Sequence, residues 1–400
     1  MEGKYYENPF CDYAPNKEKT VKEDGELHGE FVENIKSVSV TLFQKLNSSL
    51  GEMGKDDYSV YTGTSGIAFL YFLMAMKLKK PEYYKKSLKI LENTFPRLKN
   101  RRVSFLTGDS GPLALGSVMY DRLGMPEESL RCAHRVKEIL PTIVSLNSDL
   151  PDEILYGRAG YLYSLLFMNK YVGAGTIENS VIKEVVTAIL ASGKNRAIRE
   201  KRKVPLMYMW HEKYYLGAAH GISGILFLLL QAREYISQSD LQNAVRPTID
   251  FVQDLCFPSG NFPSSLGNSN DRLVQWCHGA PGMVDLFTLA YHVFRDDRYM
   301  QTAIHCGNVV WNNGILTKSY GICHGVAGNA YTFLTLYKST KNPLHLHRAC
   351  KFAEWCTSYG KYQSRVPDRP LSLFEGLAGV VYFLTDIQDP EHALFPAYGL

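Results

Sequence analysis

The sequence predicts an all-α protein, a double-layered α/α barrel (toroid) of seven helical hairpins in which a G-x-x-G motif precedes each inner helix. Three observations support this prediction. A G-x-x-G motif followed by an apolar run recurs seven times, at steps of 45 to 64 residues between first glycines. A segment with apolar residues at helical spacing and a charged face comes before each motif. No comparable run alternates with period two, so we expect no sheet.

The seven motifs lie at residues 63–66, 108–111, 157–160, 221–224, 279–282, 325–328 and 376–379. The stretches that follow them, such as residues 67–74 and 225–230, are apolar almost all round, which is typical of helices buried on every side. We expect the glycines to let two backbones come close and to allow positive φ where the chain turns inward.

Amphipathic outer helices are expected at residues 31–50, 82–95, 127–140, 179–192, 241–255, 298–312 and 344–359. Two of them begin at a proline, Pro81 or Pro126, which favours the first turn of a helix. Seven such hairpins bury their inner helices best by closing into a ring. An open solenoid would need polar caps, yet the last repeat, residues 374–386, is as apolar as the middle ones. We therefore expect residues 1–400 to form one domain.

Composition excludes several classes of function. The 44 basic and 40 acidic residues nearly balance, so nothing indicates nucleic acid or an anionic membrane as a partner. The longest apolar runs are shorter than the ~18 residues of a spanning helix. The N-terminus has no apolar core of a signal peptide and no lipid-anchor motif, and the eight cysteines are too sparse for a disulfide scaffold. We expect a cytoplasmic protein without a transmembrane segment; peripheral attachment at the plasma membrane through a partner is left open.

Two Cys-His pairs stand directly before a motif, Cys277-His278 and Cys323-His324, and their cysteines are 46 residues apart. Equivalent positions of neighbouring repeats face the same central opening, so these side chains and His220, before the fourth motif, should converge there. A sulfur and an imidazole repeated in register favour a zinc site over two buried structural cysteines. Spacing alone leaves open whether His278 or His324 is the third ligand. It also leaves His220 as a ligand, an acid and base, or a core residue.

The motifs Trp276-Cys-His-Gly-Ala-Pro-Gly282, Ala219-His-Gly-Ile-Ser-Gly224 and Gly321-Ile-Cys-His-Gly-Val-Ala-Gly-Asn-Ala-Tyr331 resemble those of the LanC-like family, the animal relatives of the bacterial lanthionine cyclases. The similarity covers essentially the whole chain and is closer to the animal proteins than to the cyclases. It implies a double α-barrel, in agreement with the repeat count. The bacterial cyclases carry a tyrosine where His278 stands.

Residue by residue, the resemblance implies that Cys277, Cys323 and His324 bind zinc and that His220 is the acid and base. It also implies glutathione binding, and the matching positions are Lys318, Arg365 and Asp368, with Lys4 replacing an arginine. Lysine keeps the charge but lacks the bidentate fork of arginine. Two carboxylates of glutathione would suit Lys318 and Arg365, and its ammonium group would suit Asp368. Glu153 is a further candidate for orienting His220.

Two functions follow as hypotheses. The first is a zinc-dependent glutathione transferase that adds the glutathione thiol to electrophiles such as dehydroalanine or dehydrobutyrine residues of proteins; the acceptor is a peptide or a small molecule. The second is a non-catalytic zinc- and glutathione-binding protein that responds to redox state and acts through interactions with regulatory protein partners. Residues 199–203, Arg-Glu-Lys-Arg-Lys, are interpreted as a solvated loop, with docking of an acidic partner or phosphopeptide as the alternative.

Overall fold

A computed structural model describes residues 4–15, 19–22, 24–54, 56–362 and 365–400. Regular structure in these residues is helical, and the only β-type pairing consists of isolated bridges. The all-α prediction is therefore confirmed.

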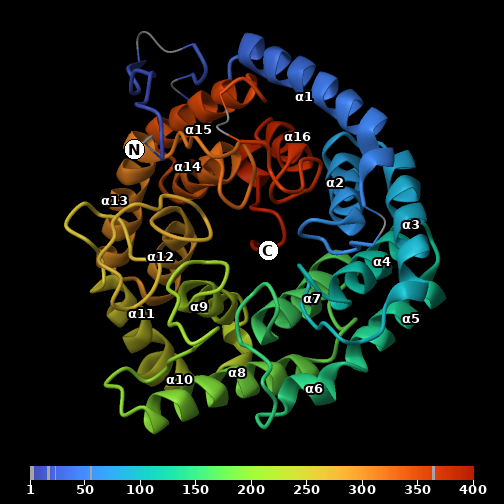
Figure 1. Cartoon of the computed structure of the whole chain (residues 1–400), viewed down its shortest axis with the longest axis vertical. Coiled ribbons are helices and arrows are strands. Elements are labelled where there is room, and N and C mark those ends of the chain that lie inside the picture. The colour runs from blue at the N-terminus through green and yellow to red at the C-terminus, as the bar shows by residue number, and fades with distance from the viewer. Residues whose placement is uncertain (1–3, 16–18, 23, 55, 363–364) are drawn as a thin grey trace.

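Seven inner helices form a closed ring (Figure 1). They are α2 (Thr64–Lys77), α4 (Ser110–Arg122), α7 (Arg158–Tyr171), α9 (Ile222–Gln231), α12 (Pro281–Phe294), α14 (Val326–Thr340) and α16 (Leu377–Asp386). Each packs on the next along the chain, and α16 packs back on α2, so every inner helix has an inner neighbour on both sides. The expected closure is present.

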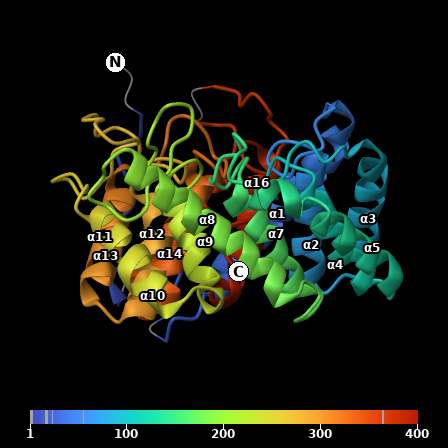
Figure 2. The ribbon, with the colours of Figure 1, turned by 90° about the horizontal axis from the view of Figure 1, so that it is seen from below.

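An outer layer surrounds this ring, and most connections from outer to inner helices lie on one face of it (Figure 2). Its helices are α1 (Gly29–Ser49), α3 (Glu82–Thr94), α5 (Pro126–Lys137), α6 (Leu140–Val144), α8 (Asn179–Arg199), α10 (Gln238–Asp240), α11 (Arg246–Gln253), α13 (Asp297–Asn313) and α15 (Pro343–Cys356). α8 runs to Arg199, beyond the predicted end at residue 192, so the basic stretch 199–203 begins on a helix. No helix in the described residues is long and apolar enough to cross a membrane.

The two layers differ in burial as their sequences predict. In α2 every residue from Ser65 to Ala75 is buried, because the helix is packed on all sides. In α3 the buried residues are Ser87, Leu88, Leu91 and Thr94, which repeat every three or four positions along one face. The charged residues between them lie toward solvent.

The glycine motifs serve close packing more than unusual backbone angles. At Gly63, Gly157, Gly221, Gly325 and Gly376 φ lies between −143° and −101°, so the expectation of positive φ is wrong there. It holds at Gly279, with φ +105°. At Gly328 a Cβ atom would lie 1.7 Å from the carbonyl oxygen of Ile322, so no larger residue fits without moving the backbone.

Backbone hydrogen bonds join the segments that precede the motifs of neighbouring repeats. The residue two positions before the first glycine donates its N–H to the equivalent residue of the next repeat around the ring. These bonds run from Cys277 to Cys323 (3.3 Å), Cys323 to Phe374 (2.8 Å), Phe374 to Tyr61 (3.1 Å) and Tyr61 to Leu106 (2.9 Å). The chain thus holds five of these positions in fixed relation around the central opening.

Candidate metal centre and its surroundings

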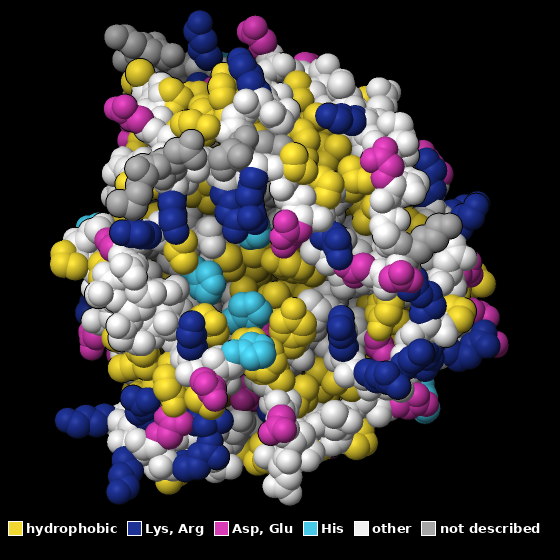
Figure 3. All heavy atoms as spheres, in the orientation of Figure 1, with side chains coloured by type: hydrophobic (Ala, Val, Ile, Leu, Met, Phe, Trp, Pro, Cys, Tyr) yellow, Lys and Arg dark blue, Asp and Glu magenta, His cyan; other side chains and the backbone are white. Residues whose placement is uncertain are grey.

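The central opening is a hollow on the face that carries the connecting loops. Histidine side chains gather near its middle, above apolar side chains, and basic and acidic side chains alternate around it (Figure 3). The lysines and arginines of this rim can attract the anionic groups of a ligand, and the apolar floor reduces the contact of the ligand with water.

Cys277, Cys323 and His324 form one cluster in which the potential ligand atoms all lie within 4.8 Å of one another. The cysteines are 7% and 3% exposed, and His324 is half-buried. Zinc binds thiolates at ~2.3 Å and imidazole at ~2.0 Å, so one ion could contact all three after small side-chain shifts. Three ligands would leave a fourth position for a substrate. Within the described chain the geometry groups His324, and not His278, with the two sulfurs.

The environment of the two sulfurs differs. The pKa of Cys277 is lowered, because Cys323 donates a hydrogen bond to its thiolate and Lys318 and Gln275 lie nearby; Gln275 Nε2 is 3.2 Å from Cys277 Sγ. Burial and the negative charge of Cys277 raise the pKa of Cys323 well above its ordinary value. A bound cation would remove this conflict, since it favours both thiolates.

His278 lies beside this cluster as a neutral side chain. Burial, followed by the charges of His220, Lys318 and His324, lowers the pKa of His278 to about 4. The ring of Tyr215 stands between two histidines, 6.0 Å from His220 and 5.8 Å from His278. The structure therefore brings all three predicted histidines to the opening.

His220 is oriented by a buried carboxylate. Its Nδ1 lies 2.9 Å from Glu153 Oε2, and Glu153 is only 2% exposed. The same carboxylate accepts hydrogen bonds from the backbone N–H groups of Leu155 (2.9 Å) and Tyr156 (2.6 Å). These bonds fix the position of Glu153, and Glu153 in turn selects the tautomer with its proton on Nδ1. The other ring nitrogen, Nε2, is then available for proton transfer.

The segments predicted to bind glutathione meet at one side of the opening. Thr317 donates its N–H to the carbonyl of Lys4 (3.1 Å), which places the N-terminal segment beside Lys318. Two residues on, Tyr6 donates its hydroxyl to the carbonyl of Tyr362 (2.7 Å), at the start of the next segment.

That segment leads to Arg365 and Asp368, which are exposed. Neither side chain forms an ion pair or a hydrogen bond with the described part of the protein. Both are therefore free to meet a ligand, whereas Lys318 is half-buried next to Cys277. The predicted binding roles of these residues remain predictions.

Comparison with known proteins decides the family. The model of the family described as "Lanthionine synthetase C-like protein" matches residues 54–400. The chain is 42% identical over 395 residues to "Glutathione S-transferase LANCL1" of Danio rerio, covering 98% of both chains. This protein belongs to the lanthionine synthetase C-like family. The resemblance inferred from the motifs is confirmed.

Two further matches show how far the similarity extends. "LanC-like protein GCL1" of Arabidopsis thaliana is 34% identical over 357 residues, covering 86% of this chain and 81% of the relative. The solved structure of "Nisin cyclase" matches with a TM-score of 0.65 at 14% identity, covering 92% of this chain and 95% of the other. At that identity the match shows the fold alone, and it confirms the α/α barrel.

This LanC-like site also contains side chains that the sequence reading missed. Tyr61 stands two residues before its first glycine, in the position of Cys277 and Cys323, and its hydroxyl contacts Cys323. Burial, followed by the neighbouring cysteines, raises the pKa of Tyr61 well above its ordinary value, so it stays protonated as a donor. Tyr156 stands one residue before its first glycine, as His220 does, and its ring is parallel to that of His220 (6.0 Å, 7°). Scanning both positions across all seven repeats would have found them.

Proposed function

We propose that this protein is a zinc-dependent glutathione transferase that adds the glutathione thiol to electrophiles, with dehydroalanine and dehydrobutyrine residues of proteins as acceptors. The observation that carries the proposal is the Cys277, Cys323 and His324 cluster beside the His220–Glu153 pair. The relative named a glutathione S-transferase, which matches nearly the whole chain, supports it.

The three side chains of the cluster would hold the zinc ion, and its chemistry is to lower the pKa of a coordinating thiol so that it reacts as a thiolate. Lys318, Arg365 and Lys4 supply positive charge for the two carboxylates of glutathione, and Asp368 supplies the negative charge for its ammonium group. Because Lys318 is half-buried, its contact is the least screened by solvent.

The reaction needs no oxidant. The glutathione sulfur forms a bond to the β-carbon of the dehydroamino acid, and the electrons of the carbon–carbon double bond move toward the carbonyl to give an enolate. His220, protonated on both nitrogens, donates the Nε2 proton to the α-carbon, and Glu153 stabilises the imidazolium before this transfer. The product is a thioether. The proton that the glutathione thiol loses restores the proton that Nε2 of His220 has given to the α-carbon, so the reaction balances.

The proposal is tested by measuring both the zinc content and the turnover of the variant Cys323→Ala. We expect the purified protein to hold one zinc per chain and to consume glutathione with a dehydroalanine peptide as acceptor. Cys323→Ala should lose the zinc and at least ~99% of turnover, since two ligands hold the ion poorly. The exposed cysteine, changed as Cys11→Ala, is the matched control and should keep both. Cys323→Ala protein that keeps stoichiometric zinc and full turnover would refute this function.

A further inference from the structure

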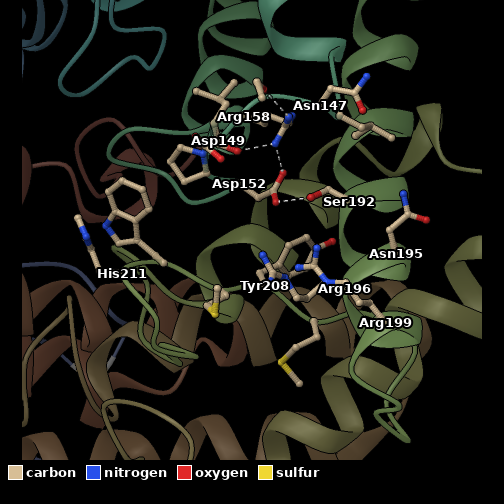
Figure 4. A pocket seen from close by; sticks show the side chains of 17 residues that line it. Asn147, Asp149, Asp152, Arg158, Ser192, Asn195, Arg196, Arg199, Tyr208 and His211 are labelled. Carbon is tan, nitrogen blue, oxygen red and sulfur yellow. Dashed lines mark hydrogen bonds and ion pairs between the residues drawn. The ribbon is translucent and has the colours of Figure 1, made fainter.

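A polar cavity of about 490 Å³ lies beside the opening (Figure 4). Its walls are residues 146–152, which connect α6 to α7, the C-terminal half of α8, and residues 207–211. The cavity has the size of a small-ligand site. None of its residues belongs to the metal cluster or to the predicted glutathione positions.

The cavity adjoins the proton-transfer pair through the backbone and through aromatic rings. Asp152 lines the cavity, and the next residue, Glu153, binds His220 on the other side. Trp210 also lines the cavity; its ring stacks on Tyr156 (5.8 Å), which stacks on His220 (6.0 Å). A ligand that fills the cavity therefore lies two ring-to-ring steps from the acid and base.

One wall of the cavity is rigid and internally neutral. Arg158, 2% exposed, forms an ion pair with Asp152 (2.9 Å) and donates to the carbonyls of Ile143 (2.7 Å) and Leu150 (2.8 Å). Asp152 also accepts a hydrogen bond from Ser192 (2.6 Å), as Figure 4 shows. With their charges and hydrogen bonds satisfied, these residues shape the cavity without selecting the charge of a ligand.

Exposed side chains on two sides of the cavity offer unused donors: Asn195 and Arg199 on α8, and His211 across the cavity from them (Figure 4). Asn195 and Arg199 follow Ser192 at helical spacing along the same face of α8 (Figure 4). Neither their side chains nor that of His211 forms a hydrogen bond or an ion pair with other described residues. Asp149 is the acidic side chain on the rim whose charge no ion pair in the described chain offsets. Three groups that can donate hydrogen bonds, one of them a permanent cation, suit an anionic ligand.

The turn that carries Trp210 and His211 is strained. Trp210 and Lys213 exchange two backbone hydrogen bonds (2.9 and 3.0 Å), and the two residues between them, His211 and Glu212, have φ of +45° and +59°. Such angles suit Asn-Gly pairs and cost non-glycine residues roughly 1 kcal/mol each. Strain of this kind is retained where position matters for function, and here it holds Trp210 between the cavity and Tyr156.

We propose that this cavity is a subsite for the acceptor polypeptide and that it binds an acidic side chain, carboxylate or phosphate, near the reacting dehydroamino acid. The inference rests on the proposed function and names its substrate class: acidic polypeptides rather than small electrophiles. An extended chain advances ~3.3 Å per residue, so the two ring-to-ring steps of 5.8 and 6.0 Å place the acidic residue at least about four positions from the reacting residue.

The test compares dehydroalanine peptides that carry glutamate, phosphoserine, alanine or lysine four to six residues away on either side. We expect kcat/KM to be about fivefold to tenfold higher for an acidic than for the alanine peptide. Arg199→Glu should abolish this preference and favour the lysine peptide instead. Lys183→Glu, the same charge change at an exposed position of α8 outside the cavity, should keep it. Comparison of the glutamate peptide with the phosphoserine peptide shows whether the subsite prefers a carboxylate or a phosphate.

Two further measurements separate this inference from the proposed function. Turnover of N-acetyldehydroalanine amide tests the chemistry without the subsite. Fluorescence anisotropy of labelled peptides with alanine in place of dehydroalanine tests binding without chemistry, and we expect Arg199→Glu to weaken the acidic peptide about fivefold or more. Equal binding of acidic and neutral peptides, or a preference that survives Arg199→Glu, would overturn the subsite even if the small acceptor is consumed. If neither the small acceptor nor any of the dehydroalanine peptides consumes glutathione, the transferase itself is refuted.

Discussion

At the scale of single residues, the site is built from the two positions before each glycine motif. The first of these positions supplies Cys277, Cys323 and Tyr61, and the second supplies His220, His278, His324 and also Tyr156. Because the repeats form a ring, these two positions of every repeat lie at the same opening. Different residue types at them therefore supply thiols, imidazoles and phenols to one site. A change at any of them should alter one function and leave the fold intact.

Replacing His220 by asparagine should remove the proton donor and keep the binding sites. We expect His220→Asn to lower turnover about 100-fold or more, with zinc content and glutathione Kd unchanged within about twofold. Steady-state kinetics, metal analysis and calorimetric titration measure these quantities, with His134→Asn, an exposed histidine on α5, as control. Unchanged turnover in His220→Asn would instead favour the non-catalytic zinc- and glutathione-binding function.

Lys318 should act on glutathione through its carboxylates. Lys318→Met removes the charge at similar size, so we expect KM for glutathione to rise about tenfold, with a smaller change in kcat. Cysteamine, a thiol without carboxylates, is the reference substrate, and its KM should change by less than about twofold. An equal rise in KM for glutathione and for cysteamine would mean that Lys318 acts on Cys277 and Cys323 and not on the carboxylates of glutathione.

At the scale of elements, a half-buried carboxylate links two inner helices. Asp285 of α12 accepts a hydrogen bond from Thr335 of α14 (2.8 Å). Burial raises the pKa of Asp285 from 3.8 to about 6, and the hydrogen bond from Thr335 and the charge of Lys338 only partly oppose this effect. Above pH 6 the helices therefore hold a charge that burial disfavours.

The pH dependence of stability should reveal this charge. The folded pKa of Asp285 lies above the unfolded one, so this carboxyl group binds more protons in the folded state between pH 4 and 6, and its own contribution to stability falls as pH rises through that range. Asp285→Asn keeps the hydrogen bond without the charge. Relative to wild type it should gain up to about 3 kcal/mol at pH 7 and almost nothing at pH 4.

Urea unfolding at both pH values measures this difference, with Asp254→Asn, an exposed aspartate, as control. An Asp285→Asn effect of equal size at pH 7 and pH 4 would contradict the assigned pKa.

At the scale of the whole molecule, the closed ring should unfold as one unit. Gly66 lies at the seam where the last repeat meets the first: a Cβ there would be 2.4 Å from the carbonyl oxygen of Val60 and 3.0 Å from Cβ of Leu373. Because every inner helix contacts two others, damage at this seam should reach distant repeats. This is the test of the single domain predicted for residues 1–400.

Gly66→Ala should destabilise the protein by about 2 kcal/mol or more, since the clash is with backbone. We expect the unfolding midpoint to shift by the same amount whether it is followed by tryptophan fluorescence or by far-ultraviolet circular dichroism. The fluorescence reports on Trp210, Trp276, Trp311 and Trp355. Gly54→Ala, where an added Cβ meets nothing within 4 Å, should have little effect. Separate transitions for the two probes would mean that the ring consists of independent units.

The sequence by itself determined the fold, the repeat positions and the two cysteines of the metal cluster. Helical periodicity and the glycine motifs are local signals, so the inner and outer helices could be read from short windows, with errors only at ends such as that of α8. The two cysteines could be predicted because each repeat carries its chemistry at the same position. The choice of His324 over His278 came from the resemblance to the LanC-like family, and the geometry groups His324 with the two sulfurs.

Only the tertiary structure decided which residues from different repeats touch. The bond from Glu153 to His220, the contact of Tyr61 with Cys323 and the pairing of Lys4 with Thr317 join positions far apart in sequence. No local pattern encodes such distances, because they depend on how seven helical hairpins close into a ring. The same holds for the cavity beside Trp210, whose walls come from three separate segments and exist only once those segments pack.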